Sequence, residues 1–500
     1  MAFFINRKVF TFIIICTIFV FAAGESSAEP ADRNFAEKLI KISSIPVGYS
    51  LISESLVVSP DSARVGYVAK KGLEQVLSID SNRDFSFNSI NRGFPIFSPD
   101  SRHTVAIVKK VGKWLVNHDG RDGSGFDAIG QVVFSPDSAR LAYVVQQNKK
   151  QFVLVDDKKR PEFDGIDRRS GLLFSPDSAR FAYQGLSADK WFMVLDAEKS
   201  PPYEKIGVKV FSPDSEHFAY TARKNKKWFF IADGKESLPY DGVDAPVYSM
   251  DGKHLAYLAL HDGMLRILLD GEEQKDFKDI GLLVFSPDSS RFVYTAKDGD
   301  SWYLIEKAEK QRNFDRVPFL VFSPNSRHLA YVGVKNDKWY AVIDGQKSKR
   351  RDAVGTILFS PDSKRVAYPA ANDQKTFMVL DGQECQACDN VDPGLFSVDS
   401  KHFAYVAHIG KKKHMVMDGI RGPAYENVSP PFFSPDSEHM AYMAKKDKQW
   451  FIIVDSVPAR LDIIGFLTGA SIVFDDQKHF HVLAIRKEKS EFVRLEVEIR

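Results

Sequence analysis

The sequence predicts an all-β protein, a β-propeller of about twelve four-stranded antiparallel blades of ~37 residues, and three observations support this fold class. A tetrapeptide of the type Ser-Pro-Asp-Ser recurs every 37 to 41 residues, and every 37 without exception from Ser212 to Ser434. Every Trp lies sixteen residues after the first Ser of such a tetrapeptide. The runs between them are apolar on both faces, as in sheets that are covered on both sides. The clear copies begin at Ser59, Ser98, Ser135, Ser175, Ser212, Ser249, Ser286, Ser323, Ser360, Ser397 and Ser434.

Each repeat supplies four short strands, as the unit at Ser323 shows. The first strand, 319–322, ends at a type I turn, because Pro324 presets φ and the following Asn tolerates the turn geometry. The second strand, 328–334, leads through a polar loop to the third, 339–343, which ends at an Asp-Gly hairpin signal. The fourth lies in 351–354 and leads into the next unit. The aromatic and β-branched runs, and the lack of a 3.6-residue period, exclude a helical repeat.

Two aromatic columns follow the repeat register, and we expect both to form the core between blades. The Trp column is Trp114, Trp191, Trp228, Trp302, Trp339 and Trp450. The second column, twenty-eight residues after the marker Ser, is Phe87, Phe126, Phe163, Tyr203, Tyr240, Phe277, Phe314 and Tyr425. A carbohydrate-stacking site would need aromatic residues outside these columns, and the sequence shows no cluster of them.

The ring is expected to close by strand exchange between the first and last segments. The last unit has only three predicted strands, and the apolar segment near 38–47 can supply the fourth, which completes twelve blades. Because one ring usually has four to eight blades, we predict two tandem six-bladed propellers, 29–284 and 285–500, with a boundary near Val284. A 7+5 division and a single large ring are the alternatives.

The repeat also resembles a known family. The pattern Phe-Ser-Pro-Asp-Ser-x-[Arg/His]-x-Ala-Tyr resembles the WD-repeat-like β-propeller repeats of TolB-type periplasmic proteins, over about residues 50 to 500. The resemblance implies the propeller fold, and it leaves function open because such propellers host many roles. TolB carries an extra α/β domain before its propeller, whereas here only about 25 residues separate the leader from the first repeat. We therefore expect a protein other than TolB itself.

The first 28 residues have the pattern of an export signal. Arg7 and Lys8 precede an apolar run at 9–21, and cleavage sites follow Gly24 and Ala28, so residues 1–28 are predicted to be a signal peptide. The run is shorter than the ~20 residues that span a bilayer, although an uncleaved anchor is the alternative. We expect a periplasmic or secreted protein with no transmembrane segment in the mature chain. The formal net charge of +2 argues neither for nor against an acidic partner.

Two cysteines remain after export, Cys385 and Cys388, and they form a C-x-x-C pair. Asp389 stands where a c-type haem site has His, no second pair is present for zinc, and the βαβ context of a thioredoxin-like motif is absent. We interpret the pair as a possible local disulfide or as two buried thiols.

Other polar residues are also locked to the register. Arg and His interchange five residues after the marker, and Arg cannot ligate a metal, so we expect this column to pair with a carboxylate of a turn or of the fourth strand. The Asp of Ser-Pro-Asp-Ser is a turn residue that bonds its own backbone. We predict no catalytic residue, no metal site and no cofactor. The column is Arg64, His103, Arg140, Arg180, His217, His254, Arg291, His328, Arg365, His402 and His439.

The lysines of the loops between the second and third strands remain outside the scaffold. In a propeller all these loops lie on one face, so we predict a basic face and, with an acidic column at the fourth strands, an acidic opposite face and rim. The candidate binding residues are Lys109, Lys110, Lys149, Lys150, Lys224, Lys226, Lys227, Lys335, Lys338, Lys411, Lys412, Lys413, Lys445 and Lys446. The acidic column is Asp127, Asp164, Glu204, Asp241, Asp315, Asp352 and Glu426.

Two interpretations of the lysines stay open. Lys in tight loops keeps blades from pairing edge to edge, or the basic face binds an anionic partner such as an acidic protein, a lipid head group or an anionic glycan. Nucleic acid is not expected, because the chain is exported. We therefore predict a non-catalytic binding or scaffold module, with an exported enzyme acting on glycans or peptides as the alternative.

Overall fold

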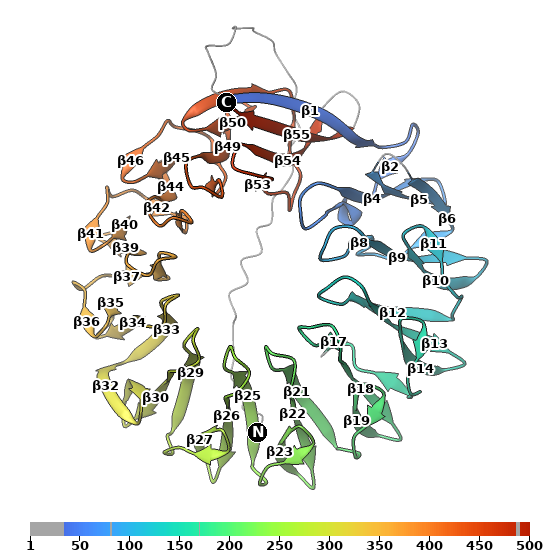
Figure 1. Cartoon of the computed structure of the whole chain (residues 1–500), viewed down its shortest axis with the longest axis vertical. Coiled ribbons are helices and arrows are strands. Elements are labelled where there is room, and N and C mark those ends of the chain that lie inside the picture. The colour runs from blue at the N-terminus through green and yellow to red at the C-terminus, as the bar shows by residue number, and fades with distance from the viewer. Residues whose placement is uncertain (1–34, 81–82, 170, 487–490) are drawn as a thin grey trace.

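The computed structural model describes residues 35–80, 83–169, 171–486 and 491–500, and within them the chain folds into twelve small antiparallel sheets arranged in one ring (Figure 1). We number these blades 1 to 12 in chain order. The one helix in the described part is the 3₁₀ turn η1, Ser53–Ser55. The all-β propeller that the repeat predicts is confirmed. The predicted signal peptide, 1–28, lies outside the described residues.

The strands recur in the order expected from the repeat, and their bounds are as follows. The first strands are continuous in five blades: β12 (Ala128–Phe134), β21 (Lys205–Phe211), β25 (Gly242–Tyr248), β29 (Asp279–Phe285) and β33 (Arg316–Phe322). In the other blades they are split in two: β2 (Ser50–Leu51) and β3 (Val57–Val58), β7 (Ser89–Ile90) and β8 (Ile96–Phe97), β16 (Gly165–Ile166) and β17 (Leu173–Phe174), β37 (Ala353–Val354) and β38 (Leu358–Phe359), β42 (Asn390–Val391) and β43 (Leu395–Phe396), β47 (Asn427–Val428) and β48 (Phe432–Phe433), β52 (Gly465–Phe466) and β53 (Val473–Phe474).

The second and third strands are the long central pair of each blade. The second strands are β4 (Val65–Lys71), β9 (Thr104–Lys110), β13 (Leu141–Gln147), β18 (Phe181–Ser187), β22 (Phe218–Lys224), β26 (Leu255–His261), β30 (Phe292–Asp298), β34 (Leu329–Lys335), β39 (Val366–Asn372), β44 (Phe403–Ile409), β49 (Met440–Lys446) and β54 (His479–Arg486). The third strands are β5 (Glu74–Ile79), β10 (Lys113–His118), β14 (Lys150–Val155), β19 (Lys190–Leu195), β23 (Lys227–Ala232), β27 (Met264–Leu269), β31 (Ser301–Glu306), β35 (Lys338–Ile343), β40 (Lys375–Leu380), β45 (Lys412–Met417), β50 (Gln449–Val454) and β55 (Glu491–Ile499).

The fourth strands are mostly two residues long and follow the Asp-Gly-type turns at the ends of the third strands, except in blade 12, where β1 from the start of the described chain takes this place. They are β6 (Arg83–Phe87), β11 (Arg121–Asp122), β15 (Lys158–Lys159), β20 (Glu198–Lys199), β24 (Lys235–Glu236), β28 (Glu272–Glu273), β32 (Glu309–Phe314), β36 (Gln346–Lys347), β41 (Gln383–Glu384), β46 (Ile420–Arg421), β51 (Val457–Leu461) and β1 (Phe35–Ser44).

The predicted position of the fourth strand needs a correction. In blade 8 this strand is β36, because Gly345 adopts a positive φ that reverses the chain at once. Arg351 still bridges back to Trp339 of the third strand, but Ala353–Val354 pairs with β39 of the next blade. The segment 351–354 is therefore a crossover between blades rather than a strand of one blade.

The two aromatic columns, predicted to form the core between blades, lie next to each other in most blades. The Trp position and the second-column position form backbone bridges in most blades, for example Trp191 with Tyr203 and Trp228 with Tyr240. Tyr203 is 2% exposed, whereas the six Trp side chains are only partly buried. Because the second column lies deeper, it contributes more to the core between blades than the Trp column does.

Strand exchange closes the ring. β1 pairs antiparallel with β55 over their whole length, from Phe35 opposite Ile499 to Ser44 opposite Glu491, and becomes the outermost strand of blade 12 (Figure 1). The segment predicted near 38–47 therefore supplies the missing strand. The turns are joined too, because the amide of Ser471 in blade 12 donates to the hydroxyl of Ser62 in blade 1 at 3.1 Å.

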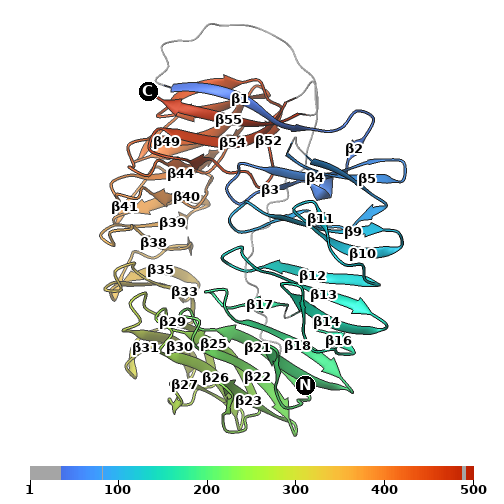
Figure 2. The same ribbon diagram turned by 45° about the vertical axis from the view of Figure 1, so that its right-hand side comes forward.

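The twelve blades form one ring, the arrangement held as an alternative, and the preferred division into two six-bladed propellers is not seen. Blades 6 and 7 share a core across the boundary proposed near Val284, in which Ile267 packs in one cluster with Ile280 and Tyr294. Both views show the sheets following one another around the ring through this point (Figures 1 and 2). The repeat length is 37 residues throughout the stretch from Ser212 to Ser434. No repeat in this stretch therefore differs in length, as a repeat that closes a smaller ring would be expected to.

Candidate functional site

Two faces of the ring carry the polar side chains that the sequence singled out. We call the face with the Ser-Pro-Asp-Ser and Asp-Gly turns the turn face, and the face with the loops between second and third strands the loop face. On the loop face, the predicted lysines divide into three groups by what their side chains contact.

The first group forms ion pairs. Lys110 pairs with Asp122, Lys150 with Asp164, Lys224 with Glu236, Lys227 with Asp241, Lys335 with Asp315 and Lys338 with Asp352, at 2.5 to 3.7 Å. The second group lies over indole rings, with the ammonium of Lys109 5.5 Å from the ring centre of Trp114 and that of Lys445 at the same distance from Trp450. These lysines are part of the scaffold.

The acidic column lies on the loop face among these lysines, so the predicted acidic rim opposite a basic face is wrong. The reason is that the column sits at the crossover between blades, which reaches the same face as the loops. Asp241, for example, accepts from the Lys227 ammonium in its own blade and from the Asp262 amide at 3.2 Å in the next. The hydrogen bond from Lys227 lowers the pKa of Asp241. Asp127, Asp164 and Asp352 join two neighbouring blades in the same way.

The third group of lysines has no ion pair with the residues that the structure describes. It comprises Lys149, Lys226, Lys411, Lys412, Lys413 and Lys446. Lys411, Lys412 and Lys413 adjoin one another in blade 10, and Lys446 lies on the corresponding loop of blade 11. We call these four residues, together with the exposed Lys448 of the same loop, the blade 10–11 lysine patch.

On the turn face, the Arg/His column pairs with carboxylates as predicted. In all eleven units the side chain contacts the acid of the following Asp-Gly-type turn at 2.6 to 3.1 Å, as in His254 with Asp270 and Arg291 with Glu306. Most of these side chains also cover an aromatic ring of the next blade. His254 stacks on Phe285, for example. This column joins blades to one another.

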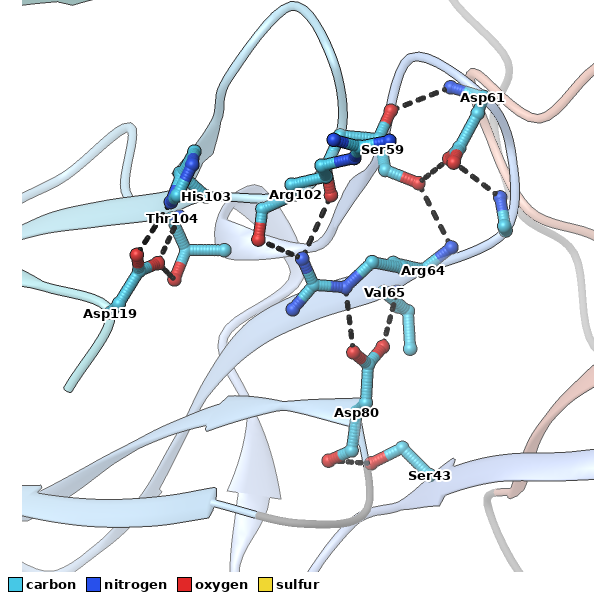
Figure 3. A network of polar contacts seen from close by, with 12 residues as sticks. Ser43, Ser59, Asp61, Arg64, Val65, Asp80, Arg102, His103, Thr104 and Asp119 are labelled. Atoms are coloured by element: carbon cyan, nitrogen blue, oxygen red, sulfur yellow. Dashed lines mark hydrogen bonds and ion pairs between the residues drawn. The ribbon is translucent and has the colours of Figure 1, made fainter. Parts of the chain in front are cut away.

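A cavity of about 440 Å³ opens on the turn face between blades 1 and 2. Its wall includes Arg64, Asp80, Arg102, His103 and Asp119 (Figure 3). Figure 3 shows the Arg64 guanidinium held by the Asp80 carboxylate, at 2.9 Å, and by the carbonyls of blade 2.

The His103–Asp119 pair beside this cavity is held firmly. His103 Nδ1 lies 2.7 Å from Asp119 Oδ2, and the other carboxylate oxygen accepts from the Thr104 amide at 2.7 Å. Burial raises the pKa of Asp119, but the hydrogen bonds from His103 and Thr104 and the charge of the nearby histidines lower it further, so the net shift is downward. Asp119 is therefore a fixed carboxylate at the cavity wall.

Two residues of blade 2 that sequence reasoning missed depart from the repeat. Nineteen and twenty residues after the marker, where blade 6 has Leu268 and Leu269, blade 2 has Asn117 and His118. Asn117 is 3% exposed and donates to Asp122 at 2.7 Å, while the His118 ring packs edge-on against Phe134. The register itself could have found them, because they are polar residues in two columns that are otherwise apolar except for Ser78 and Glu306.

A third missed feature is a lysine on a first strand. Lys209 stands three residues before its marker, a position that holds apolar residues, Pro or Gly in the ten other clear units. Its ammonium donates to the Gly171 carbonyl of the preceding blade at 2.9 Å. Burial lowers the pKa of Lys209 to about 8, although the negative charge of Asp167 raises it.

The C-x-x-C pair consists of free thiols in the structure, the second of the two readings of the sequence. Cys388 is 4% exposed and lies in the second aromatic column, where it bridges to Thr376 of the third strand. Burial raises the pKa of the Cys385 thiol and of the Cys388 thiol. Both cysteines pack as small core residues.

Among the described residues, no helix has the length and apolar character needed to cross a membrane.

Comparisons with known proteins add little to this picture. No family model matches the chain, and no curated protein matches it. Among solved structures, it is similar to a eukaryotic initiation factor (15% identity, 66% of this chain and 96% of that chain, TM-score 0.35) and to the Dos1 propeller (11% identity, 57% and 92%, TM-score 0.28). A third is dihydro-heme d1 dehydrogenase NirN in complex with DHE (13% identity, 59% and 72%, TM-score 0.27). At these values none of them carries an argument about function.

Proposed function

We propose that this chain is an exported, non-catalytic β-propeller of the WD-repeat-like, TolB type, and that it binds an anionic protein or envelope component through the blade 10–11 lysine patch. The observation that carries the proposal is the unequal use of lysines on the loop face. In most blades the loop lysines neutralise the carboxylates of the crossovers, whereas the patch keeps its positive charges available to a partner.

Binding is favoured over catalysis because the recurring acid–base pairs have a scaffold role. A His or Arg beside a carboxylate could suggest acid–base chemistry at any one turn. The same pair recurs in eleven units and joins each blade to the next, so it supports the ring. An enzyme acting on glycans or peptides is the second candidate. It is supported by the cavity between blades 1 and 2 and by Asn117 and His118 beside it, which depart from the repeat.

Charge reversal tests the binding proposal. The variant with Lys411→Glu, Lys412→Glu and Lys413→Glu should elute from a heparin-type matrix, or from vesicles with anionic lipids, at clearly lower salt than the native protein. The reason is that each reversed charge removes a salt-dependent attraction. Retention would be measured across a salt gradient at constant pH.

A matched control carries the same change in net charge elsewhere. Lys158→Glu, Lys235→Glu and Lys253→Glu alter exposed lysines on fourth strands and on the turn face, and this variant should elute close to the native protein. Equal retention of the native protein and the patch variant, or equal losses in the two variants, would show that the patch is not the binding surface.

A further inference from the structure

We propose that blade 2 binds a divalent transition-metal ion of the zinc class through His103, His118 and Asp119, at the edge of the cavity between blades 1 and 2. His103 directly precedes β9, His118 is the last residue of β10 and Asp119 follows it, and one ligand atom from each lies within 4.8 Å of the others. Two imidazoles and a carboxylate are a usual ligand set for zinc, with a fourth position left for water or a substrate.

The distances suit such an ion after small adjustments. His103 Nδ1 lies 2.7 Å and His118 Nε2 3.7 Å from Asp119 Oδ2. Bonds of about 2.1 Å around a tetrahedral ion place neighbouring ligand atoms about 3.4 Å apart, which lies between these two values. Asp119 Oδ2 therefore lies near both ring nitrogens.

His118 supplies a separate observation that points to a ligand. Its Nε2 is shielded from solvent and has no hydrogen-bond partner among the residues that the structure describes, although the ring as a whole is part exposed. Buried ring nitrogens normally have a partner. A metal ion would use the lone pair of this nitrogen.

The surroundings support the ligands. Asp119 Oδ1 accepts from the Thr104 amide, which orients the carboxylate as supporting hydrogen bonds do in metal sites. Arg64 and Arg102 are the nearby cations on the cavity wall, and Asp80 pairs with Arg64. The cavity is bordered by His103 and Asp119, so it gives a fourth ligand access from the solvent.

The site is specific to this blade. The His–Asp pair of the turn face recurs, but its blade 6 copy, His254 with Asp270, has Leu269 where blade 2 has His118. Two other groups could hold a cation by geometry, one around His217 and one around His261. Each has a single His, and one of its two carboxylates, Asp214 or Asp241, already accepts hydrogen bonds from the backbone and from a Ser or Lys side chain. With one imidazole instead of two, these groups suit a transition metal less well.

The test measures metal binding by the chelator-treated protein without a histidine tag. Isothermal titration with Zn²⁺ should show one site, and Co²⁺ should give the visible absorption of a low-symmetry four- or five-coordinate ion. His118→Leu introduces the residue that blade 6 has at this position, so the variant is expected to fold. It should bind Zn²⁺ on the order of 100-fold more weakly.

The matched control is His254→Asn, which alters the corresponding pair in blade 6 and should leave the affinity unchanged. Thermal unfolding followed by circular dichroism establishes that both variants fold. A second readout needs no variant, because Zn²⁺ should raise the melting temperature of the native protein in proportion to its occupancy. No binding by the folded native protein at 1 mM Zn²⁺, or equal affinity in folded His118→Leu, would overturn the proposal.

Discussion

Single residues that leave the repeat register give individual blades their character. Asn117 and His118 make blade 2 polar at two neighbouring positions that are apolar in most other blades, and Lys209 places an amine on a first strand. None of these three residues belongs to a recognised motif, so a search for motifs does not find them. Counting from the marker Ser would have found all three, but the Gly171 carbonyl that Lys209 contacts lies in the preceding blade and required the structure.

Lys209 leads to a prediction about pH. Its pKa of about 8 in the folded protein is below the ordinary 10.5, so the unfolded chain holds more protons between these two values. The free energy of unfolding should therefore rise as pH rises from about 8 to about 10.5, where the unfavourable buried charge disappears.

The measurement compares the native protein with Lys209→Met by urea unfolding at pH 7.5 and pH 10. Groups common to both chains cancel in the difference, so the native protein should gain stability relative to the variant at the higher pH. A difference that stays constant with pH would contradict the lowered pKa.

At the scale of the element, the Ser-Pro-Asp-Ser turn both ends a strand and joins two blades. The sequence predicted the turn type and the use of Asp on its own backbone. In blade 7 the hydroxyl of Ser286 donates to Asp288, and the Asp288 amide donates to the hydroxyl of Ser326 in blade 8 at 2.9 Å. This second contact recurs around the ring and was invisible in the sequence, because it joins residues about one repeat apart.

The turn carboxylates make the protein sensitive to acid. Hydrogen bonds from Ser286, and from the amide and hydroxyl of Ser290, lower the pKa of Asp288 far below its usual value. The hydroxyl of the marker Ser is also the largest cause of the lowered pKa in Asp100, Asp137, Asp177, Asp214, Asp251, Asp362, Asp399 and Asp436. A lowered pKa stabilises the fold above the unfolded value near 3.8, and this stabilisation is lost as pH falls further.

Asp288→Asn tests this effect, and the chain offers its own precedent. Blade 8 has Asn325 at this position and keeps the same contact with its marker Ser, at 2.7 Å. The variant should fold, and its stability difference from the native protein should shrink between pH 4 and pH 2. Guanidine unfolding at several pH values measures it, and a difference that does not change with pH would refute the role of this carboxylate.

At the scale of the whole molecule, ring closure depends on one strand. β1 pairs with β55 along the outside of blade 12. Phe35 and Leu39 pack in the core between blades 11 and 12, and Ile42 packs in the core between blades 12 and 1. Tyr67 of blade 1 contacts the Phe492 ring of blade 12 at 5.1 Å between centres. The closure was predicted because the last repeat lacks a strand and one apolar segment is left over.

Deletion of residues 35–44 should open the ring. Full burial of an apolar side chain stabilises a fold by ~1.5–3 kcal/mol. Phe35 is buried and Leu39 and Ile42 are half-buried, so their loss should lower the free energy of unfolding by on the order of 4 kcal/mol. The bared edge of β55 should also promote self-association.

Urea unfolding and size-exclusion chromatography measure the two effects, with a chain that begins at Phe35 as the control. If the deletion variant were as stable and as monodisperse as the control, β1 would not be the strand that closes the ring.

The blade, the number of blades, the closing strand and the carboxylate pairing of the Arg/His column follow from the sequence alone. The blade and the carboxylate pairing depend on residues within one repeat, and the number of blades and the closing strand follow from counting the repeats. Both can be read from the spacing of the marker Ser. The folded molecule was needed to see that the twelve blades share one ring, and that the acidic column meets the lysines on the loop face. The physical reason is that ring size depends on small rotations summed over every blade interface, and ion pairs between blades depend on where the crossovers run. Neither is set by any single stretch of the chain.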